Sequence, residues 1–160
     1  LNTVLEDNTE PKVPLSPTQE ASFLSFVQSD KVYQKYYDEI IILLGTGLRI
    51  SELCGLTESD IDFEHKLINV DHQLLKVAVN FETMFRGLVK KYNKSHEEAL
   101  PKVTTPHTLR HTFCTNLANA GMNPKALQYI MGHSNINMTL NYYAHATSDS
   151  AMAEMERLIA

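Results

Sequence analysis

Prolines and glycines divide the segment from 105 to 143 into short helices, and this division constrains the fold more than any other feature of the chain. Thr105 and Pro106 match the N-cap and the first position of a helix. Gly121 and Gly132 interrupt the helical pattern, because glycine favours the ends of helices. The predicted helices run from 107 to about 120, from 124 to 131, and from about 137 onward.

The first of these helices carries a histidine and an arginine on one face. His107 and Arg110 are three positions apart, a spacing that places two side chains together on a helix. An imidazole accepts or donates a proton near neutral pH. A guanidinium is a permanent planar cation that fits phosphate oxygens. The pair therefore indicates a site for a phosphate group.

Three further residues complete a candidate set for phosphate chemistry. His133 follows the break at Gly132, and Tyr143 lies ten positions further on. Arg49 comes early in the chain, after a turn that contains two glycines. Two arginines, two histidines and a tyrosine suffice for attack of a phenolic oxygen on a phosphodiester, and this reaction requires no metal.

Four ordered motifs resemble the catalytic domain of the tyrosine recombinases. They are Thr46-Gly-Leu-Arg-Ile-Ser-Glu-Leu53, His107-Thr-Leu-Arg110, Gly132-His-Ser134 and Tyr143-Ala-His145. Within that family the sequence is most similar to the integrases of bacterial conjugative transposons. The resemblance extends over nearly the whole chain from about Ser16. It implies an α+β fold, mainly α with a small antiparallel β-sheet.

The resemblance also implies a function. Such a protein is a site-specific DNA recombinase or integrase, which cleaves and rejoins strands through a covalent 3′-phosphotyrosyl intermediate and so excises and integrates a mobile element. Tyr143 would be the nucleophile. Arg49 and Arg110 would hold the nonbridging phosphate oxygens, and His107 and His133 would supply hydrogen bonds and proton transfer.

The implied partners are double-stranded DNA, as element ends and a target site, and further copies of the chain assembled as a dimer or tetramer on that DNA. An accessory DNA-bending or excision protein is also implied. The phosphotyrosyl bond keeps the energy of the broken bond, so no nucleotide cofactor is implied, and no metal or membrane is.

Tyr142 is the alternative nucleophile. Adjacent helical residues are about 100° apart, so two neighbouring tyrosines on a helix cannot both face one site. Tyr143 fits the Tyr-x-His ending of the family, because His145 follows it. The family tolerates the shorter spacing as well, so Tyr142 stays open.

The rest of the chain is predicted as a linker, a helical core with one hairpin, and a terminal helix. Residues 1–15 are polar and contain prolines, as an interdomain linker does. The catalytic domain would extend over 16–147, and a helix at 148–160 would pack on it or dock on a neighbouring protomer. Inside the domain we expect helices at 16–29, 32–44, 49–54 and 80–92, a hairpin at 61–70, an extended piece at 73–79 and a polar loop at 92–104.

A segment of several tens of residues is predicted to be missing near 76–77. After the hairpin the family continues with another strand and an exposed lysine in a turn, whereas this chain enters a helix at once. Either the chain is shortened or its numbering closes over residues left out, and the second explanation is favoured because loss of part of a sheet would endanger folding. The catalytic lysine therefore has no assigned position. Lys76 is the nearest candidate, but an exposed strand-end lysine is the simpler interpretation.

Charge and composition fit a globular protein that binds DNA with one face. The formal net charge of -5 argues against indiscriminate coating of nucleic acid. Residues 1–76 have 13 Asp and Glu against 6 Lys and Arg, whereas residues 77–133 have 3 against 7. No apolar run approaches a membrane span. The resemblance implies a bacterial cytoplasmic protein that associates with the nucleoid when it binds DNA. Cys54 and Cys114 are predicted to be reduced core thiols.

Other classes of protein compete with this interpretation. A zinc hydrolase would use His107 and His111, but no glutamate lies between them as in His-Glu-x-x-His sites, and Arg110 would place a cation beside the metal. A noncatalytic helix-turn-helix DNA-binding module would explain the helices around Gly121 but not Arg49 or the ordered tyrosine. A type IB topoisomerase shares the chemistry, but the resemblance favours the integrase.

Overall fold

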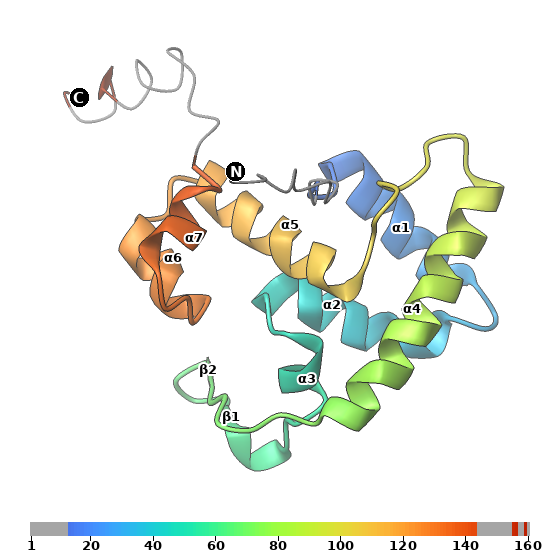
Figure 1. Cartoon of the computed structure of the whole chain (residues 1–160), viewed down its shortest axis with the longest axis horizontal. Helices are drawn as coiled ribbons and strands as arrows, with labels where there is room; N and C mark the ends of the chain where they lie inside the picture. The colour runs from blue at the N-terminus through green and yellow to red at the C-terminus, as the bar shows by residue number, and fades with distance from the viewer. Residues whose placement is uncertain (1–12, 144–154, 157–158, 160) are drawn as a thin grey trace, which may run out of the picture. The chain divides into compact units, whose positions relative to one another are not determined.

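The computed structural model describes residues 13–143, 155–156 and 159, which belong to two compact units. Unit 1 contains residues 1–112, and unit 2 contains residues 113–160. The helix α5, Pro106–Asn119, contains the boundary between them (Figure 1). Each unit has its own cluster of buried apolar side chains.

Unit 1 is built from helices and one small β-sheet (Figure 1). The strands β1 (Ile61–Asp62) and β2 (Leu67–Ile68) are antiparallel, so that Ile61 lies opposite Ile68. The helices are α1 (Pro17–Ser29), α2 (Tyr37–Thr46), α3 (Ile50–Leu53) and α4 (Leu75–Ser95), with 3₁₀ turns η1 (Gln34–Tyr36) and η2 (Glu58–Asp60). The predicted class, mainly α with a small antiparallel sheet, is confirmed.

Local sequence signals set the ends of the first two helices. The Ser16 hydroxyl accepts a hydrogen bond from the Gln19 N–H at 3.1 Å, and the Gln19 side chain accepts one from the Ser16 N–H at 3.0 Å, which forms a capping box. The helix predicted from 32 begins at Tyr37, because residues 34–36 form a 3₁₀ turn. It continues past the first predicted stop, a glycine, and ends at Gly47, whose φ of 66° is left-handed.

Aromatic side chains form the centre of the core of unit 1. The ring of Phe23 packs edge-on against Phe85 and Tyr92, with centroid distances of 5.9 and 5.7 Å. The Tyr92 hydroxyl donates to Ser22 Oγ at 2.7 Å, so its polar atom is satisfied. The same cluster contains Leu15, Val27, Ile40, Leu43, Leu44, Leu48, Phe81, Leu88, Val89, Leu100 and Leu109.

The extended piece predicted at 73–79 is wrong, because α4 begins at Leu75. The alternation of Leu75, Val77 and Val79 indicated a strand, but these three side chains are exposed and Ala78 is the buried one. Ala78 lies one turn before the next buried residue of α4, so the helical spacing of the core extends through it. The same helix runs on to Ser95 and shortens the predicted polar loop.

Unit 2 packs short helical segments around a small apolar cluster. After α5 come α6 (Pro124–Ile130) and α7 (Ile136–Leu140), where the sequence predicts helices. Asn123 and Asn135 cap them, because each side chain accepts a backbone hydrogen bond at 2.9 Å from the residue two positions on. The buried members of the cluster are Cys114, Ala118, Leu127 and Met131. Cys114 is thus the core thiol that was predicted, whereas Cys54 in unit 1 is only partly buried.

Two predicted segments lie mostly outside the described residues: the linker at 1–15 and the helix at 148–160. At the described end of the first, Leu15 is buried and its N–H donates to Thr112 Oγ1 at 2.9 Å. In the part of the chain that the structure describes, none of the helices combines the length and the apolar character that crossing a membrane requires.

We predict that Phe85→Ala destabilises unit 1 by about 3–5 kcal/mol, the usual cost of removing a fully buried phenylalanine. The Phe85 side chain is 0% exposed and contacts the ring of Phe23. Urea unfolding followed by circular dichroism measures the change. The control is Phe63→Ala, which should cost less than about 0.5 kcal/mol because Phe63 is 78% exposed. Equal losses in both variants would contradict the place of Phe85 in the core.

Candidate functional site

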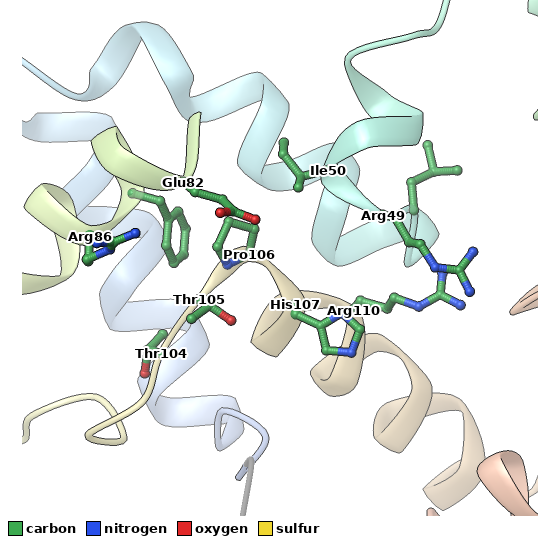
Figure 2. Close-up of a pocket in the computed structure, with 11 residues that line it drawn as sticks. Arg49, Ile50, Glu82, Arg86, Thr104, Thr105, Pro106, His107 and Arg110 are labelled. Carbon is green, nitrogen blue, oxygen red and sulfur yellow. The ribbon is translucent and has the colours of Figure 1, made fainter. Parts of the chain in front are cut away.

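A cleft of about 200 Å³ in unit 1 contains three of the five predicted site residues (Figure 2). Arg49 directly precedes α3, whereas His107 and Arg110 lie in the first turns of α5. The other residues that line the cleft are Leu48, Ile50, Glu82, Phe85, Arg86, Thr104, Thr105 and Pro106. Two motifs that are far apart in the sequence therefore meet in one cleft.

Glu52 holds the side chain of Arg49 at the edge of the cleft. Arg49 Nη1 donates to Glu52 Oε1 at 2.6 Å, and the Arg49 N–H donates to Glu52 Oε2 at 2.6 Å. Both bonds use the first turn of α3, where Arg49 is the N-cap residue. The Arg49 side chain nevertheless remains 42% exposed, so an anion from solvent can reach it.

Arg110 is almost wholly buried, with 4% exposure. Its Nη1 donates to the carbonyl oxygen of Gly47 at 2.5 Å. A buried cation is costly unless its donors are used, so this bond both stabilises and orients the guanidinium. Figure 2 shows the Arg110 and Arg49 side chains reaching toward the same end of the cleft, beside His107.

Arg86 also lines the cleft, although its sequence context does not mark it as a site residue. It lies on α4, one turn after Glu82. From the sequence it is one of several cations on the exposed side of a helix, and only the path of the loop before α5 distinguishes it. That loop brings Thr104 and Thr105 to the cleft. Figure 2 shows Arg86 at the end of the cleft opposite to Arg49.

His133 lies in unit 2, directly after the turn at Gly132, whose φ is 58°. Its imidazole is nearly buried, and Nδ1 lies 3.0 Å from Thr139 Oγ1. The ring is also stacked with that of Tyr142, at a centroid distance of 6.4 Å. These two neighbours fix the orientation of the imidazole.

Tyr142 and Tyr143 lie in the turn after α7, not on the helix that was predicted to carry them. Their N–H groups donate to the carbonyl oxygens of Thr139 and Leu140 at 3.0 and 2.9 Å. Both side chains pack against the apolar cluster of unit 2. Because neither tyrosine lies on α7, the rotation of about 100° between neighbouring helical residues does not decide between them.

The Tyr143 hydroxyl donates to the carbonyl oxygen of Met122 at 2.5 Å. Burial, and to a smaller extent the neighbouring Cys114, raises the pKa of the Tyr143 phenol above its ordinary value of 10.0. The phenol is therefore protonated at neutral pH and bound to the backbone. This hydrogen bond must break before the phenol can give its proton to a base.

One group of three candidate metal ligands lies close together among the described residues. The ligand atoms of Asp60, Asp71 and His72 are within 4.8 Å of one another. The hydrogen bond that the His72 ring donates to the Asp71 carboxylate is the main cause that raises the pKa of His72, which favours the protonated ring over a metal ligand. His107 and His111, the pair considered for zinc, belong to no such group in the described part of the chain.

The model of one known protein family matches most of the chain. This model, described as the Phage integrase family, matches residues 14–80 and residues 76–149. The chain belongs to the phage integrase family. The two matches overlap at 76–80, in the first turns of α4.

Individual phage integrase relatives match nearly the whole chain. The transposase from transposon Tn916 of Enterococcus faecalis is 49% identical over 219 residues, which cover 99% of this chain and 54% of that protein. Tyrosine recombinase XerA of Pyrococcus furiosus is 26% identical over 196 residues, which cover 98% of this chain and 68% of that protein. The chain thus spans about half the length of the transposon relative. The matched stretch of 219 residues exceeds this 160-residue chain by 59.

The integrase of transposon Tn1549 has the same fold. Its structure with circular intermediate DNA is 57% identical, has a TM-score of 0.86, and covers 94% of this chain and 67% of that chain. Two more of its structures, 56% identical with TM-scores of 0.88, cover 96% and 98% of this chain and 68% and 69% of theirs. One has lysine in place of arginine at position 225, and the other has phenylalanine in place of tyrosine at position 379.

We predict that the Tyr143 phenol ionises above pH 10, because burial raises its pKa. In an NMR titration of ring-labelled tyrosine, the parent chain should show an ionisation step above pH 10 that Tyr143→Phe lacks. Since the folded pKa exceeds the unfolded one, the phenol stabilises unit 2 fully below about pH 10, and this contribution is lost as pH rises through the folded pKa. Tyr129→Phe, which removes an exposed phenol, is the control. Loss of a step at or below pH 10 in Tyr143→Phe would refute the burial of this hydroxyl.

Proposed function

We propose that this chain is the catalytic part of a site-specific transposon integrase, a tyrosine recombinase that cleaves and rejoins DNA through a covalent 3′-phosphotyrosyl intermediate. The observation that carries the proposal is the meeting of Arg49, His107 and Arg110 in one cleft. Membership of the phage integrase family and the transposon relatives support it. The reaction excises and integrates a mobile element.

Arg49 and Arg110 bind the nonbridging oxygens of the phosphate to be cleaved. Their cations stabilise the negative charge that develops around phosphorus, which is usually the largest contribution in such sites. The effect depends on donors that are in place before the reaction. Gly47 orients Arg110, and Glu52 orients Arg49, so both guanidinium groups meet that condition.

Tyr143 is the nucleophile. Its phenolic oxygen bonds to phosphorus while the bond from phosphorus to the 5′ oxygen breaks, and the 5′ oxygen leaves as a hydroxyl after it takes a proton. His107 and His133 supply hydrogen bonds and move the two protons, which contributes roughly 10²–10⁴-fold in such reactions. Attack of a 5′ hydroxyl from a partner strand reverses the step and restores the phenol.

Residue spacing supports the pairing of Arg49 and Tyr143 with the two substituted positions of the Tn1549 integrase. Positions 225 and 379 of that protein are 154 residues apart, whereas Arg49 and Tyr143 are 94 residues apart. The difference is 60, close to the 59 residues by which the matched Tn916 stretch exceeds this chain. One missing segment near 76–77 accounts for both values, and the two family matches meet at 76–80.

The missing segment would include the strand and the lysine that follow the hairpin in tyrosine recombinases. Lys76, the nearest lysine to the join, is exposed in the first turn of α4 and is not among the residues that line the cleft. A lysine supplied by the missing segment is therefore the better candidate for the catalytic one.

Double-stranded DNA, as element ends and a target site, is the proposed substrate. The Tn1549 integrase structures contain circular intermediate DNA and transposon right end DNA, which supports this choice. Copies of the chain would assemble as a dimer or tetramer on that DNA, with residues 148–160 docking on a neighbour and 1–15 linking to another domain. An accessory DNA-bending or excision protein would assist them in the bacterial cytoplasm.

We predict that Tyr143→Phe abolishes a covalent adduct with a suicide DNA substrate, nicked next to the cleavage point and analysed on a denaturing gel. The assay uses this chain and a form completed with the 60-residue segment of a transposon relative inserted between Lys76 and Val77. The adduct should form in the completed protein, survive in Tyr142→Phe and disappear in Tyr143→Phe, because only Tyr143 supplies the attacking oxygen.

The other outcomes of this assay are informative as well. An adduct that survives Tyr143→Phe but not Tyr142→Phe would move the nucleophile by one residue. An adduct in the completed form alone would assign an essential group to the missing segment. If both forms bind DNA and neither forms an adduct, the chain is a noncatalytic helix-turn-helix DNA-binding module and not a recombinase.

We predict that Arg110→Lys lowers the single-turnover cleavage rate of the completed form by about 10²–10³-fold, the usual effect of removing one preorganised donor. Lysine keeps the charge but lacks the planar fork that can bond the Gly47 carbonyl and a phosphate together. Lys90→Arg, a charge-conserving change on the exposed side of α4, is the control and should leave the rate unchanged. An Arg110→Lys rate within tenfold of the parent would argue against this role.

A further inference from the structure

The cleft of unit 1 has a second end, which the proposed cleavage chemistry does not use. Figure 2 shows Arg49, His107 and Arg110 toward one end and Arg86 toward the other. Thr105 directly precedes α5 and also lines the cleft, and Figure 2 shows it between Arg86 and His107. The second end therefore presents the cation of Arg86, and the Thr105 hydroxyl lies between the two ends.

These two groups have no partner within the described part of the chain. There the Arg86 guanidinium makes neither a hydrogen bond nor an ion pair, and the Thr105 hydroxyl makes no hydrogen bond. By contrast, Arg49 is paired with Glu52, so its position depends on the protein itself. A guanidinium and a hydroxyl that face one cleft without protein partners are donors available to a ligand, and phosphate oxygens are their usual acceptors in DNA complexes.

Glu82 divides the cleft into two positions for anions. It lies one turn before Arg86 on α4, and Figure 2 shows it between Arg86 and Arg49. Among the described residues no ion pair joins Glu82 to Arg86. A carboxylate in the middle of the cleft repels an anion there, so the cleft favours one anion at each end over a single central one.

We propose that Arg86 binds a second phosphate of the same DNA strand, next to the phosphate held by Arg49, His107 and Arg110. This inference rests on the proposed function and extends it. A DNA strand carries phosphates at regular intervals, so a cleft with cations at both ends matches two neighbouring ones. Arg86 is thus a positioning residue, because two phosphate contacts fix the direction of the strand where one contact leaves it free to pivot.

The first test measures DNA binding as a function of salt concentration for the parent chain, Arg86→Ala and Lys90→Ala. We expect Arg86→Ala to weaken binding roughly tenfold, as loss of a charged hydrogen bond does, and to reduce the slope of log K against log salt by about 1. Arg86→Lys should recover the slope but only part of the affinity. Lys90 is the matched control, since it is an exposed cation one turn further along α4 and outside the cleft.

The decisive test uses duplexes in which one phosphate at a time, on each side of the cleavage point, is replaced with a neutral methylphosphonate. At a single position next to the cleaved phosphate, the affinity ratio of the parent to Arg86→Ala should fall to about one, because the charge that Arg86 binds is gone. At all other positions the ratio should stay near ten. For Lys90→Ala the ratio should be the same on every duplex.

The readout separates this inference from the proposed function. A ratio that stays constant at every substituted position overturns the role of Arg86, even if Tyr143 forms its adduct. A ratio that falls at one position supports the second phosphate site, even if no adduct forms and the recombinase chemistry fails. Absence of any DNA binding by the parent chain and by its completed form overturns both.

Discussion

The hydrogen bond from the Arg110 guanidinium to the Gly47 carbonyl, 2.5 Å long, joins parts of the chain that are 63 residues apart. A cation with 4% exposure is tolerated only when protein groups replace its water. The acceptor is available because Gly47 ends α2 in a left-handed conformation and turns the chain toward Arg49. The turn at Gly47 therefore fixes the positions of both the buried Arg110 and the exposed Arg49. A larger residue at 47 would strain the turn, shift the carbonyl that accepts the bond and disturb both cations together.

Most of the fold was predictable because its signals are local. The capping box at Ser16 and the cap at Asn123 are short-range hydrogen bonds between residues that the sequence displays directly. The secondary structure was predicted wrongly where two local signals compete. At 73–79 an alternation of apolar residues indicated a strand, but the helical spacing of the longer α4 prevailed and left those residues exposed. The alternation covers only the five residues from 75 to 79, which is too short to decide between the two periods.

The candidate site was predictable only where its residues belong to recognisable motifs. Arg49, His107 and Arg110 were singled out from the sequence, and the structure places them in one cleft. Arg86 was not singled out. Its position in the helical pattern of α4 indicates that it is exposed, but the pattern does not indicate which distant segment lies next to it. The acceptor of the Tyr143 hydroxyl was equally hidden, because a backbone carbonyl 21 residues away carries no signature in the sequence. Contacts of this kind depend on tertiary packing, which residue types alone do not specify.

The Glu52 carboxylate competes with any external anion for the guanidinium of Arg49. It is held by the first turn of α3, so its effective concentration at the guanidinium is in the millimolar range or above. A free phosphate or a small acidic metabolite at lower concentration gains little by displacing it. A polymer that offers neighbouring phosphates to several cations at once can compensate for the lost pair. Internal competition of this kind selects ligands by valency, so the cleft favours polyanions over the dilute single anions of a cell.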